Sequence, residues 1–380
     1  MFNTELGLFC HMHDNWAELL TGEPYNLKIS EDGLYVMFKY NQLTSDFNIP
    51  MVREARGIIF RKDDFSHPVC WPFMKFGNYG ESYAPEIDWS TAFVSEKVDG
   101  SLIKVWWDVE WKISTNGTID AYKAELNNVL MHEFGTYFYT TVCKHYGTFD
   151  AFTAVLDEDK TYMFELVGPY NRVVVPYAEP AIYFLGARNK YTGEEFNCSS
   201  GMAGALGMGK FKLPKQYPFN TLEHCIKVTE NFPWDAEGVV ACDAQFNRVK
   251  IKSPAYVMAH FARNNNVINR KHLLEVILSG ETEEFLCYAS DYKEELEELQ
   301  GLMRSFCKVG DQIAKSCQRL YDIPKKTYAY WVQTLPKIYQ DLAFRNYNNI
   351  MSTKDYTAGW NENKWDTYLE EFEKLKESFS

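Results

Sequence analysis

The sequence has no long uninterrupted apolar run, no internal repeat and no low-complexity tract. A membrane-spanning helix needs about 18 or more consecutive apolar residues, and no stretch of the 380 residues approaches that length. The first residues include Glu5, His11 and Asp14, which is unlike a targeting segment. We therefore expect a soluble, intracellular protein with no membrane partner.

Paired cysteine motifs are also absent. The nine cysteines are odd in number and scattered, with no CxxC pair and no histidine spacing typical of zinc. Disulfides persist in oxidising compartments, whereas cytosolic thiols stay reduced. The pattern predicts reduced thiols in a cytoplasmic protein.

Positive charge is scarce, because 39 Lys and Arg face 52 Asp and Glu and the formal net charge is −13. Phosphate contacts normally come from a basic surface. Any nucleic-acid site must therefore be a basic groove on an acidic body. With 46% hydrophobic and 16% aromatic residues, the chain can fill two or three cores, which excludes a disordered protein.

The first two thirds of the sequence are rich in strand-forming segments. Short runs of β-branched and aromatic residues are separated by Gly, Asn, Asp and Pro, which is typical of antiparallel sheets. These runs are 35–38, 57–60, 92–94, 102–106, 162–166 and 238–241. We expect one longer helix over Ala121 to Val142, where apolar residues recur at three- and four-residue steps.

After about Tyr256 the pattern becomes helical. Apolar residues recur at helical spacing in four sets: Leu273, Leu274, Ile277; Leu296, Leu299, Met303, Phe306; Trp331, Leu335, Ile338, Leu342; and Trp365, Leu369, Phe372, Leu375. They predict four or five amphipathic helices. The polar stretch 263–266 suits a linker. We therefore predict an α+β protein, with antiparallel sheets and flanking helices over 1–262 and an all-helical domain over 263–380.

A lysine at the end of one predicted strand is a candidate nucleophile. Lys97 is followed by Asp99 and by Gly100, which permits a turn. A neutral amine attacks phosphorus well, and neighbouring cations or loss of water favour the neutral form. Taken alone, the segment 97–101 is equally compatible with a plain surface turn.

Two glutamates lie within apolar strands, Glu165 in 162–166 and Glu237 before 238–241. Burying such groups without partners is costly. Either could instead be a strand-edge residue that faces water. Together with Asp99 they would offer the oxygen ligands that magnesium prefers.

Cations form the remaining candidates. Lys250 and Lys252 share one face of a predicted strand, because strand side chains alternate. That face suits a triphosphate, although lysines also guard solvated sheet edges. Arg56 and Lys75 add two cations before the candidate nucleophile.

In order and content together, these segments resemble the motifs of lysine-dependent nucleotidyltransferases, the superfamily of DNA ligases, RNA ligases and mRNA capping enzymes. Within it the chain is most similar to the RNA ligase 1 family of T-even phages. The similarity runs through Phe38 to Asn41, Arg56 to Ile58, Lys75-Phe76, Lys97 to Leu102, Asn171-Arg172, Lys250 to Ser253, Tyr256 and Lys326 to Ala329.

The resemblance implies an adenylyltransferase domain followed by a helical domain associated with tRNA. It implies an ATP-dependent RNA ligase: Lys97 attacks the α-phosphorus of ATP, AMP passes to an RNA 5′-phosphate, and a 3′-hydroxyl displaces AMP. The expected substrate is RNA, a nicked tRNA undergoing repair. The expected state is a monomer, in the host cytoplasm if a phage encodes it.

The resemblance also assigns the site. Lys97 would be catalytic, with ATP and Mg²⁺ as cofactors. The residues expected to bind ATP are Glu96, Arg56, Lys75, Glu165, Glu237, Lys250 and Lys252. The residues expected to bind magnesium are Asp99, Glu165, Glu237 and, at a second site near Glu281 and Glu284, Glu283.

Two features leave alternatives open. Where the related ligases have a lysine before the glycine of the next motif, this chain has Asn116, so a triphosphate contact there is not expected. The acidic residues 281–284 also suit the first turn of a helix. The competing functions are a DNA ligase or capping-type nucleotidyltransferase, and an RNA-binding scaffold without turnover. Helices rather than a small barrel after Tyr256 disfavour the first, and the retained charged motifs disfavour the second.

Overall fold

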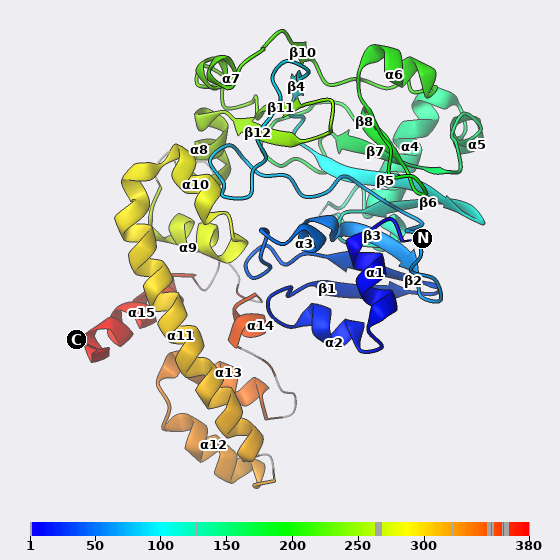
Figure 1. Cartoon of the computed structure of the whole chain (residues 1–380). Helices are drawn as coiled ribbons and strands as arrows, with labels where there is room; N and C mark the ends of the chain where they lie inside the picture. The colour runs from blue at the N-terminus through cyan, green and yellow to red at the C-terminus, as the bar shows by residue number, and fades with distance from the viewer. Residues whose placement is uncertain are drawn as a thin grey trace. The chain divides into compact units, whose positions relative to one another are not determined.

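The computed structural model describes residues 2–126, 128–262, 268–320, 322–347, 351, 353–358, 360 and 365–379 (Figure 1). Two compact units are present, Met1–His260 and Phe261–Ser380. The first contains three antiparallel sheets with helices beside them, and the described part of the second is helical. The predicted α+β class is confirmed.

The three sheets of the first unit pair their neighbouring strands antiparallel. The first sheet has the order β1 (Lys28–Asp32), β2 (Tyr35–Lys39), β3 (Arg56–Arg61). The second is β10 (Gln216–Tyr217), β4 (Phe93–Glu96), β11 (Gly238–Cys242), β12 (Arg248–Lys252). The third is β6 (Glu110–Thr115), β5 (Ser101–Asp108), β7 (Lys160–Val167), β8 (Ala181–Asn189), β9 (Glu195–Asn197). Because β4 and β5 follow each other directly in the chain, the segment between them joins the second and third sheets.

Helices cover the sheets of the first unit. They are α1 (Glu5–Met12), α2 (Trp16–Thr21), α3 (Pro50–Glu54), α4 (Phe134–Tyr146), α5 (Phe149–Thr153), α6 (Ser200–Ala205), α7 (Leu222–Thr229) and α8 (Pro254–Ala262). A large core lies between α4 and the third sheet, where Tyr137 and Phe138 pack among Phe152, Phe164 and Phe184. Each fully buried aromatic ring contributes about 1.5–3 kcal/mol, so this core holds the third sheet in place.

The helix expected over Ala121 to Val142 is present only in its second half, because α4 begins at Phe134. The prediction is wrong for the residues before Phe134. Before it, a short 3-10 turn ends at Lys123, and Phe134 N–H donates to the Ala124 carbonyl at 2.9 Å. The Asn128 side chain accepts from the Leu130 N–H at 2.9 Å, which makes a local turn. Val129 and Leu130, at positions that matched the helical spacing, are 85% and 76% exposed.

The second unit contains α9 (Arg270–Ser279), α10 (Thr282–Tyr288), α11 (Lys293–Arg319), α12 (Lys325–Gln333), α13 (Lys337–Arg345), α14 (Thr353–Ala358) and α15 (Trp365–Phe379). These exceed the four or five helices expected. The set that begins at Trp331 is divided between α12 and α13, because Pro336 caps the start of a new helix. None of the described helices is both long and apolar enough to cross a bilayer.

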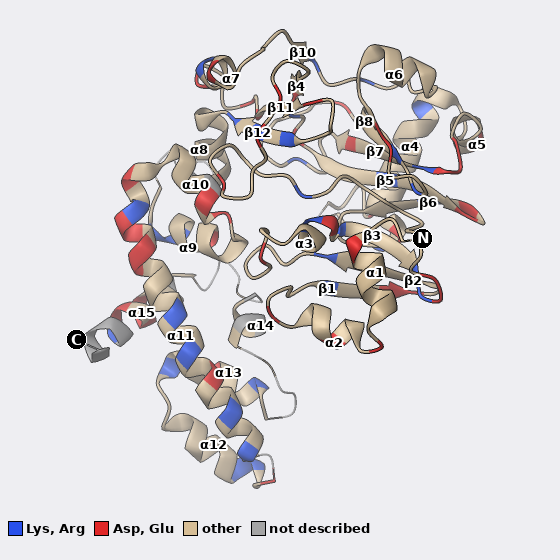
Figure 2. Cartoon of the chain, viewed as in Figure 1, with Lys and Arg blue, Asp and Glu red and all other residues tan. Residues whose placement is uncertain are grey.

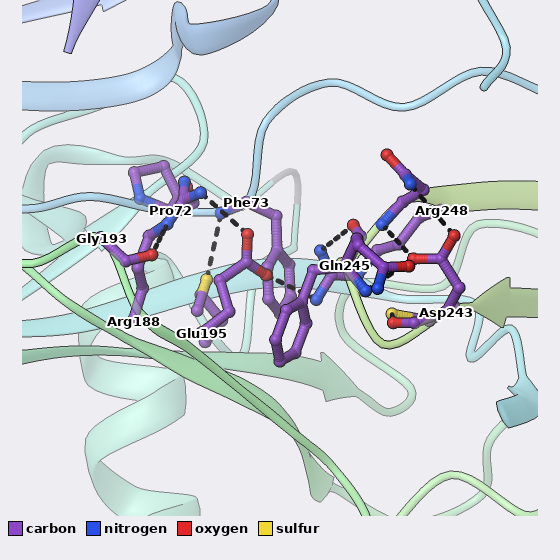
Figure 3. A network of polar contacts seen from close by, with 12 residues as sticks. Pro72, Phe73, Arg188, Gly193, Glu195, Asp243, Gln245 and Arg248 are labelled. Carbon is purple, nitrogen blue, oxygen red and sulfur yellow. Dashed lines mark hydrogen bonds and ion pairs between the residues drawn. The ribbon is translucent and has the colours of Figure 1, made fainter. Parts of the chain in front are cut away.

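A buried ionic triad ties the third sheet to the second (Figure 3). Glu195 on β9 pairs with Arg188 on β8 at 2.8 Å and with Arg248 on β12 at 2.6 Å. Arg188 also donates to the carbonyls of Pro72 and Gly193. The two guanidinium groups therefore share one carboxylate whose side chain is only 7% exposed.

We expect Glu195→Gln to lower the free energy of unfolding by about 3 kcal/mol. The reason is that it leaves two buried guanidinium groups without a counter-charge. Urea unfolding of the full chain measures the loss, and the exposed neighbour Glu194 provides the matched Glu194→Gln control. Equal stability of the two variants would contradict a structural role for the triad.

Candidate active site

A cavity of about 310 Å³ lies within the first unit. Small-molecule sites usually begin near this volume. Five of the residues singled out in the sequence line it: Arg56, Glu96, Lys97, Glu165 and Lys250. The cavity therefore brings together residues that are up to 194 positions apart between Arg56 and Lys250.

Lys97 is fixed at one wall of the cavity by strand pairing. It follows β4 directly, and its N–H donates to the Gly238 carbonyl at the start of β11 at 2.9 Å. Gly238 faces Lys252 of β12 in register. Three strand ends thus bring Lys97, Glu237 and Lys252 to one place.

The side chains at this point form a compact charged group. Lys97 Nζ lies 2.7 Å from Glu237 Oε1, and Lys252 Nζ lies 3.5 Å from the same oxygen. The Glu237 side chain is 4% exposed and that of Lys97 is 23% exposed. One carboxylate therefore pairs with both ammonium groups.

Two carboxylates retain capacity for a cation. Glu237 Oε2 is buried without a hydrogen-bond partner in the described part of the chain. The pKa of Glu165 is raised to about 8, chiefly by burial; the positive charge of Lys97 opposes this rise and the negative charge of Glu237 adds to it. Burial and a like charge disfavour the ionised form, and a bound divalent cation would reverse that preference. The chemistry of Glu165 and Glu237 thus fits magnesium, although the described residues contain no group of three or more His, Cys, Asp or Glu side chains arranged to hold a metal.

Both carboxylate oxygens of Asp99 accept hydrogen bonds from the protein itself. Its Oδ2 accepts hydrogen bonds from the N–H groups of Val174 and Val175 at 2.9 and 2.7 Å. Its Oδ1 accepts from the Tyr256 hydroxyl at 2.8 Å. Both oxygens are engaged and the residue is 5% exposed. A magnesium contact from Asp99 stays a prediction.

Comparison with known proteins shows the family of the chain. A family model described as RNA ligase matches residues 54–256, more than half of the chain and all of the cavity-lining residues. The chain belongs to the RNA ligase family.

Individual relatives in this family are distant. The chain is 28% identical over 273 residues to a protein of Autographa californica nuclear polyhedrosis virus named as a bifunctional polynucleotide kinase/RNA ligase, covering 66% of this chain and 37% of that protein. It is 28% identical over 341 residues to an RNA ligase of Rhodothermus phage RM378, covering 75% of this chain and 76% of the relative. A solved archaeal ATP-dependent RNA ligase superposes with a TM-score of 0.47 at 14% identity, covering 79% of each chain. The chain thus spans little more than a third of the viral bifunctional protein.

Three more of the residues expected to bind ATP in this RNA ligase line the cavity. Arg56 and Lys250 line it and flank the Phe76 ring, at 5.2 and 5.6 Å from its centroid. Glu96 also lines it, and its Oε2 accepts from the Lys215 N–H at 3.1 Å.

Lys75 is not among the lining residues. It is buried, and its ammonium lies 4.5 to 5.7 Å from the ring centroids of Phe47, Tyr40 and Tyr83. Aromatic faces attract a cation, so the ammonium is held by this cage. An ATP contact from Lys75 stays a prediction.

Glu283 is an exposed residue of α10 in the second unit. Glu281 precedes that helix, and its Oε2 accepts from the Ser279 hydroxyl at 3.1 Å. The side chain of Glu284 lies outside the described residues. The second magnesium site therefore stays a prediction.

Sequence reasoning missed Arg248 and Phe76, which also line the cavity. Arg248 begins β12 and alternates with Lys250 and Lys252, so it shares their face of the strand. That alternation was the available signal. Phe76 belongs to the Lys75-Phe76 pair of the family similarity but received no role, because an aromatic residue beside a lysine is equally typical of a core.

We expect Asp99→Ala to lower the free energy of unfolding by about 3 kcal/mol. The substitution would leave two backbone N–H groups and one hydroxyl without the carboxylate that now accepts their hydrogen bonds. Urea unfolding in EDTA isolates this effect from any metal, and Tyr256→Phe, which removes one of the three bonds, should cost less. Unchanged stability of Asp99→Ala in EDTA would refute the structural role.

Proposed function

We propose that the chain is an ATP-dependent RNA ligase whose nucleophile is Lys97. The observation that carries this proposal is the position of Lys97 Nζ, at the wall of a nucleotide-sized cavity and 2.7 Å from Glu237. Membership of the RNA ligase family supports the reaction class. The cosubstrate is ATP, and the product is an RNA strand sealed between a 5′-phosphate and a 3′-hydroxyl.

The first step forms a bond between Lys97 Nζ and the α-phosphorus of ATP. Lys97 must lose a proton before its nitrogen can attack, because only the neutral amine has a free electron pair. As the nitrogen–phosphorus bond forms, the bond to the pyrophosphate oxygen breaks. Arg56 and Lys250, which line the same cavity, would align the phosphates and neutralise their charge.

The next two steps transfer and release AMP. An oxygen of the RNA 5′-phosphate attacks the AMP phosphorus, and Lys97 leaves as the amine. The RNA 3′-hydroxyl then attacks the 5′-phosphate and displaces AMP, so a phosphodiester forms. Glu165 and Glu237 would hold magnesium, which would neutralise the charge of the reacting phosphates when bound.

The described structure favours RNA ligation over the competing enzyme functions. DNA-sealing and capping relatives are expected to carry a small barrel of strands after the closing lysine pair. Here the described residues after β12 form helices and no strand. The charged centre of Lys97, Glu237 and Lys252 also favours turnover over a passive scaffold.

The second unit offers a surface suited to RNA. Between Arg304 and Arg345 the chain has eight Lys and Arg against three Asp, and no Glu. All eight cations are exposed, and Figure 2 shows them along the later part of α11 and on α12 and α13. The start of α11 is acidic, with Glu294, Glu295, Glu297 and Glu298. We infer that this basic surface binds the phosphate backbone of a structured RNA, a nicked tRNA.

We expect Lys97→Ala to form no AMP adduct with ATP and magnesium, while it still joins RNA that carries a 5′-adenylate. Lys97 acts only before AMP reaches the RNA. Intact-mass spectrometry detects the adduct, and a gel assay with pre-adenylylated RNA detects joining. A protein–AMP adduct on the Lys97→Ala variant would show that the nucleophile is another residue.

We expect Lys325→Glu/Lys326→Glu to reduce the preference for a nicked tRNA over a plain oligonucleotide severalfold, with adduct formation unchanged. Acidic residues suit the first turn of α12, so the helix should persist. The exposed Lys293 at the acidic start of α11 supplies the control Lys293→Glu. Competition between the two RNAs at two salt concentrations measures the effect. An unaltered preference in the double variant would exclude this surface from RNA recognition.

A further inference from the structure

A buried lysine lies beside one end of the cavity. Lys104, on β5, is 0% exposed, and its Nζ donates to the carbonyl of Gly57 on β3. A Cβ at Gly57 would lie 2.7 Å from Lys104 Nζ and 2.8 Å from the Asn116 carbonyl oxygen. The φ of Gly57 is +76°, a value that side chains rarely adopt. Glycine at this position therefore lets Lys104 and the 116–117 turn meet.

A second lysine reaches the same turn. Lys39, at the end of β2, is half-buried, and its Nζ would lie 3.2 Å from a Cβ at Gly117. Burial lowers the pKa of Lys39. With Arg56, the residue before Gly57, three cations from three strands surround Gly57 and the turn at Asn116.

Three cations meet here, and the Glu165 carboxyl, which interacts electrostatically with Arg56, forms no ion pair with them. In the described ranges no carboxylate forms an ion pair with Lys39, Arg56 or Lys104. The titratable groups that act on Lys104 are Cys70, Arg56 and Lys39, and burial, the largest influence, lowers its pKa to about 8. Retaining an unpaired buried charge costs stability. An anionic ligand would offset that cost.

Two polar atoms at this end of the cavity also lack partners. Arg56 Nη1 and Asn116 Oδ1 are buried without a hydrogen-bond partner in the described part of the protein, and both residues line the cavity. An unpaired guanidinium N–H is a donor prepared for a phosphate oxygen. The surplus of positive charge and the open donor thus occur at the same place.

We propose that Lys39 and Lys104 supply the positive charge of the lysine that this chain lacks at position 116: Lys39 binds the β- and γ-phosphates of ATP together with Arg56, and Lys104 acts through the residues that it positions. Lys104 is a positioning residue: it holds the Gly57 carbonyl and places its charge behind Arg56 and Asn116. Lys39 contributes from the other side of the turn. The inference rests on the proposed function, because it concerns the pyrophosphate end of the same ATP site.

Binding titrations on the full chain test this assignment. The probes are an ATP analogue with a methylene group between the α- and β-phosphorus, and AMP. We expect Lys104→Met and Lys39→Met each to weaken analogue binding about tenfold or more, the effect of one lost charge-assisted contact. AMP binding should change less than about twofold on the same scale. Lys112→Met is the control, because Lys112 lies on the same hairpin but pairs with Glu110 at 2.6 Å.

Relocating the charge gives the sharpest test. Asn116→Lys added to Lys104→Met should restore most of the analogue affinity, because it returns a cation to the same turn, whereas Asn116→Met should not. The wild-type affinity for the analogue should fall as the pH rises through about 8, and this fall should be weaker in Lys104→Met. A purely structural role for Lys104 would produce neither the rescue nor the change in pH profile.

The outcomes separate the two proposals. Equal weakening of AMP and analogue, or no weakening in either lysine variant, overturns the phosphate assignment while leaving Lys97 as the nucleophile. A wild-type protein that binds neither probe and forms no adduct overturns the proposed function itself. If Lys104→Met lowers the melting temperature sharply, the half-buried Lys39→Met variant decides the matter.

Discussion

The contact between Lys97 Nζ and Glu237 Oε1, at 2.7 Å, depends on a precise strand arrangement. It exists because β11 lies between β4 and β12, with Val239 opposite both Glu96 and Ile251. A shift of one residue in either register would turn the side chains to the opposite face of the sheet. This pairing places Lys97 at the wall of the cavity. It also places Lys250 and Lys252 of β12 on the same side of the sheet. Much of the first unit, including the Glu195 triad that ties β12 to the third sheet, maintains that register.

Two ionisable groups of the first unit, the partly buried Glu165 and the fully buried Lys104, have no ion-pair partner among the described residues. Burial raises the pKa of Glu165 to about 8 and lowers that of Lys104 to about 8, so for both groups it disfavours the charged form. For Lys104 the unfolded chain binds more protons than the folded chain between about pH 8 and the ordinary lysine value. Stability should therefore rise as the pH increases through that window. Below it, the fold carries the cost of an unpaired charge, and a bound polyphosphate would remove that cost. Lys104 thus reduces stability and favours the ligand.

Strands could be predicted from the sequence, because their pattern depends only on neighbouring residues. The strand runs at 35–38, 57–60 and 238–241 correspond to β2, β3 and β11, because alternation and β-branching are local. The expected helix failed where Asn128 formed its own turn and left Val129 and Leu130 exposed. Five of the expected site residues line one cavity, whereas the aromatic cage around Lys75 depends on rings from distant segments. Lys104 could not be recognised, because a lysine within a strand looks like a solvent-facing residue until its neighbours are known.

We propose that Lys97 carries AMP during the reaction. Incubating the wild-type chain with each of the four ribonucleoside triphosphates and magnesium, followed by peptide-mapping mass spectrometry, tests it most directly. We expect one adduct, formed with ATP, that contains AMP and maps to Lys97. An adduct that maps to Lys104, Lys250 or Lys252, or one that forms with GTP in preference to ATP, would contradict it.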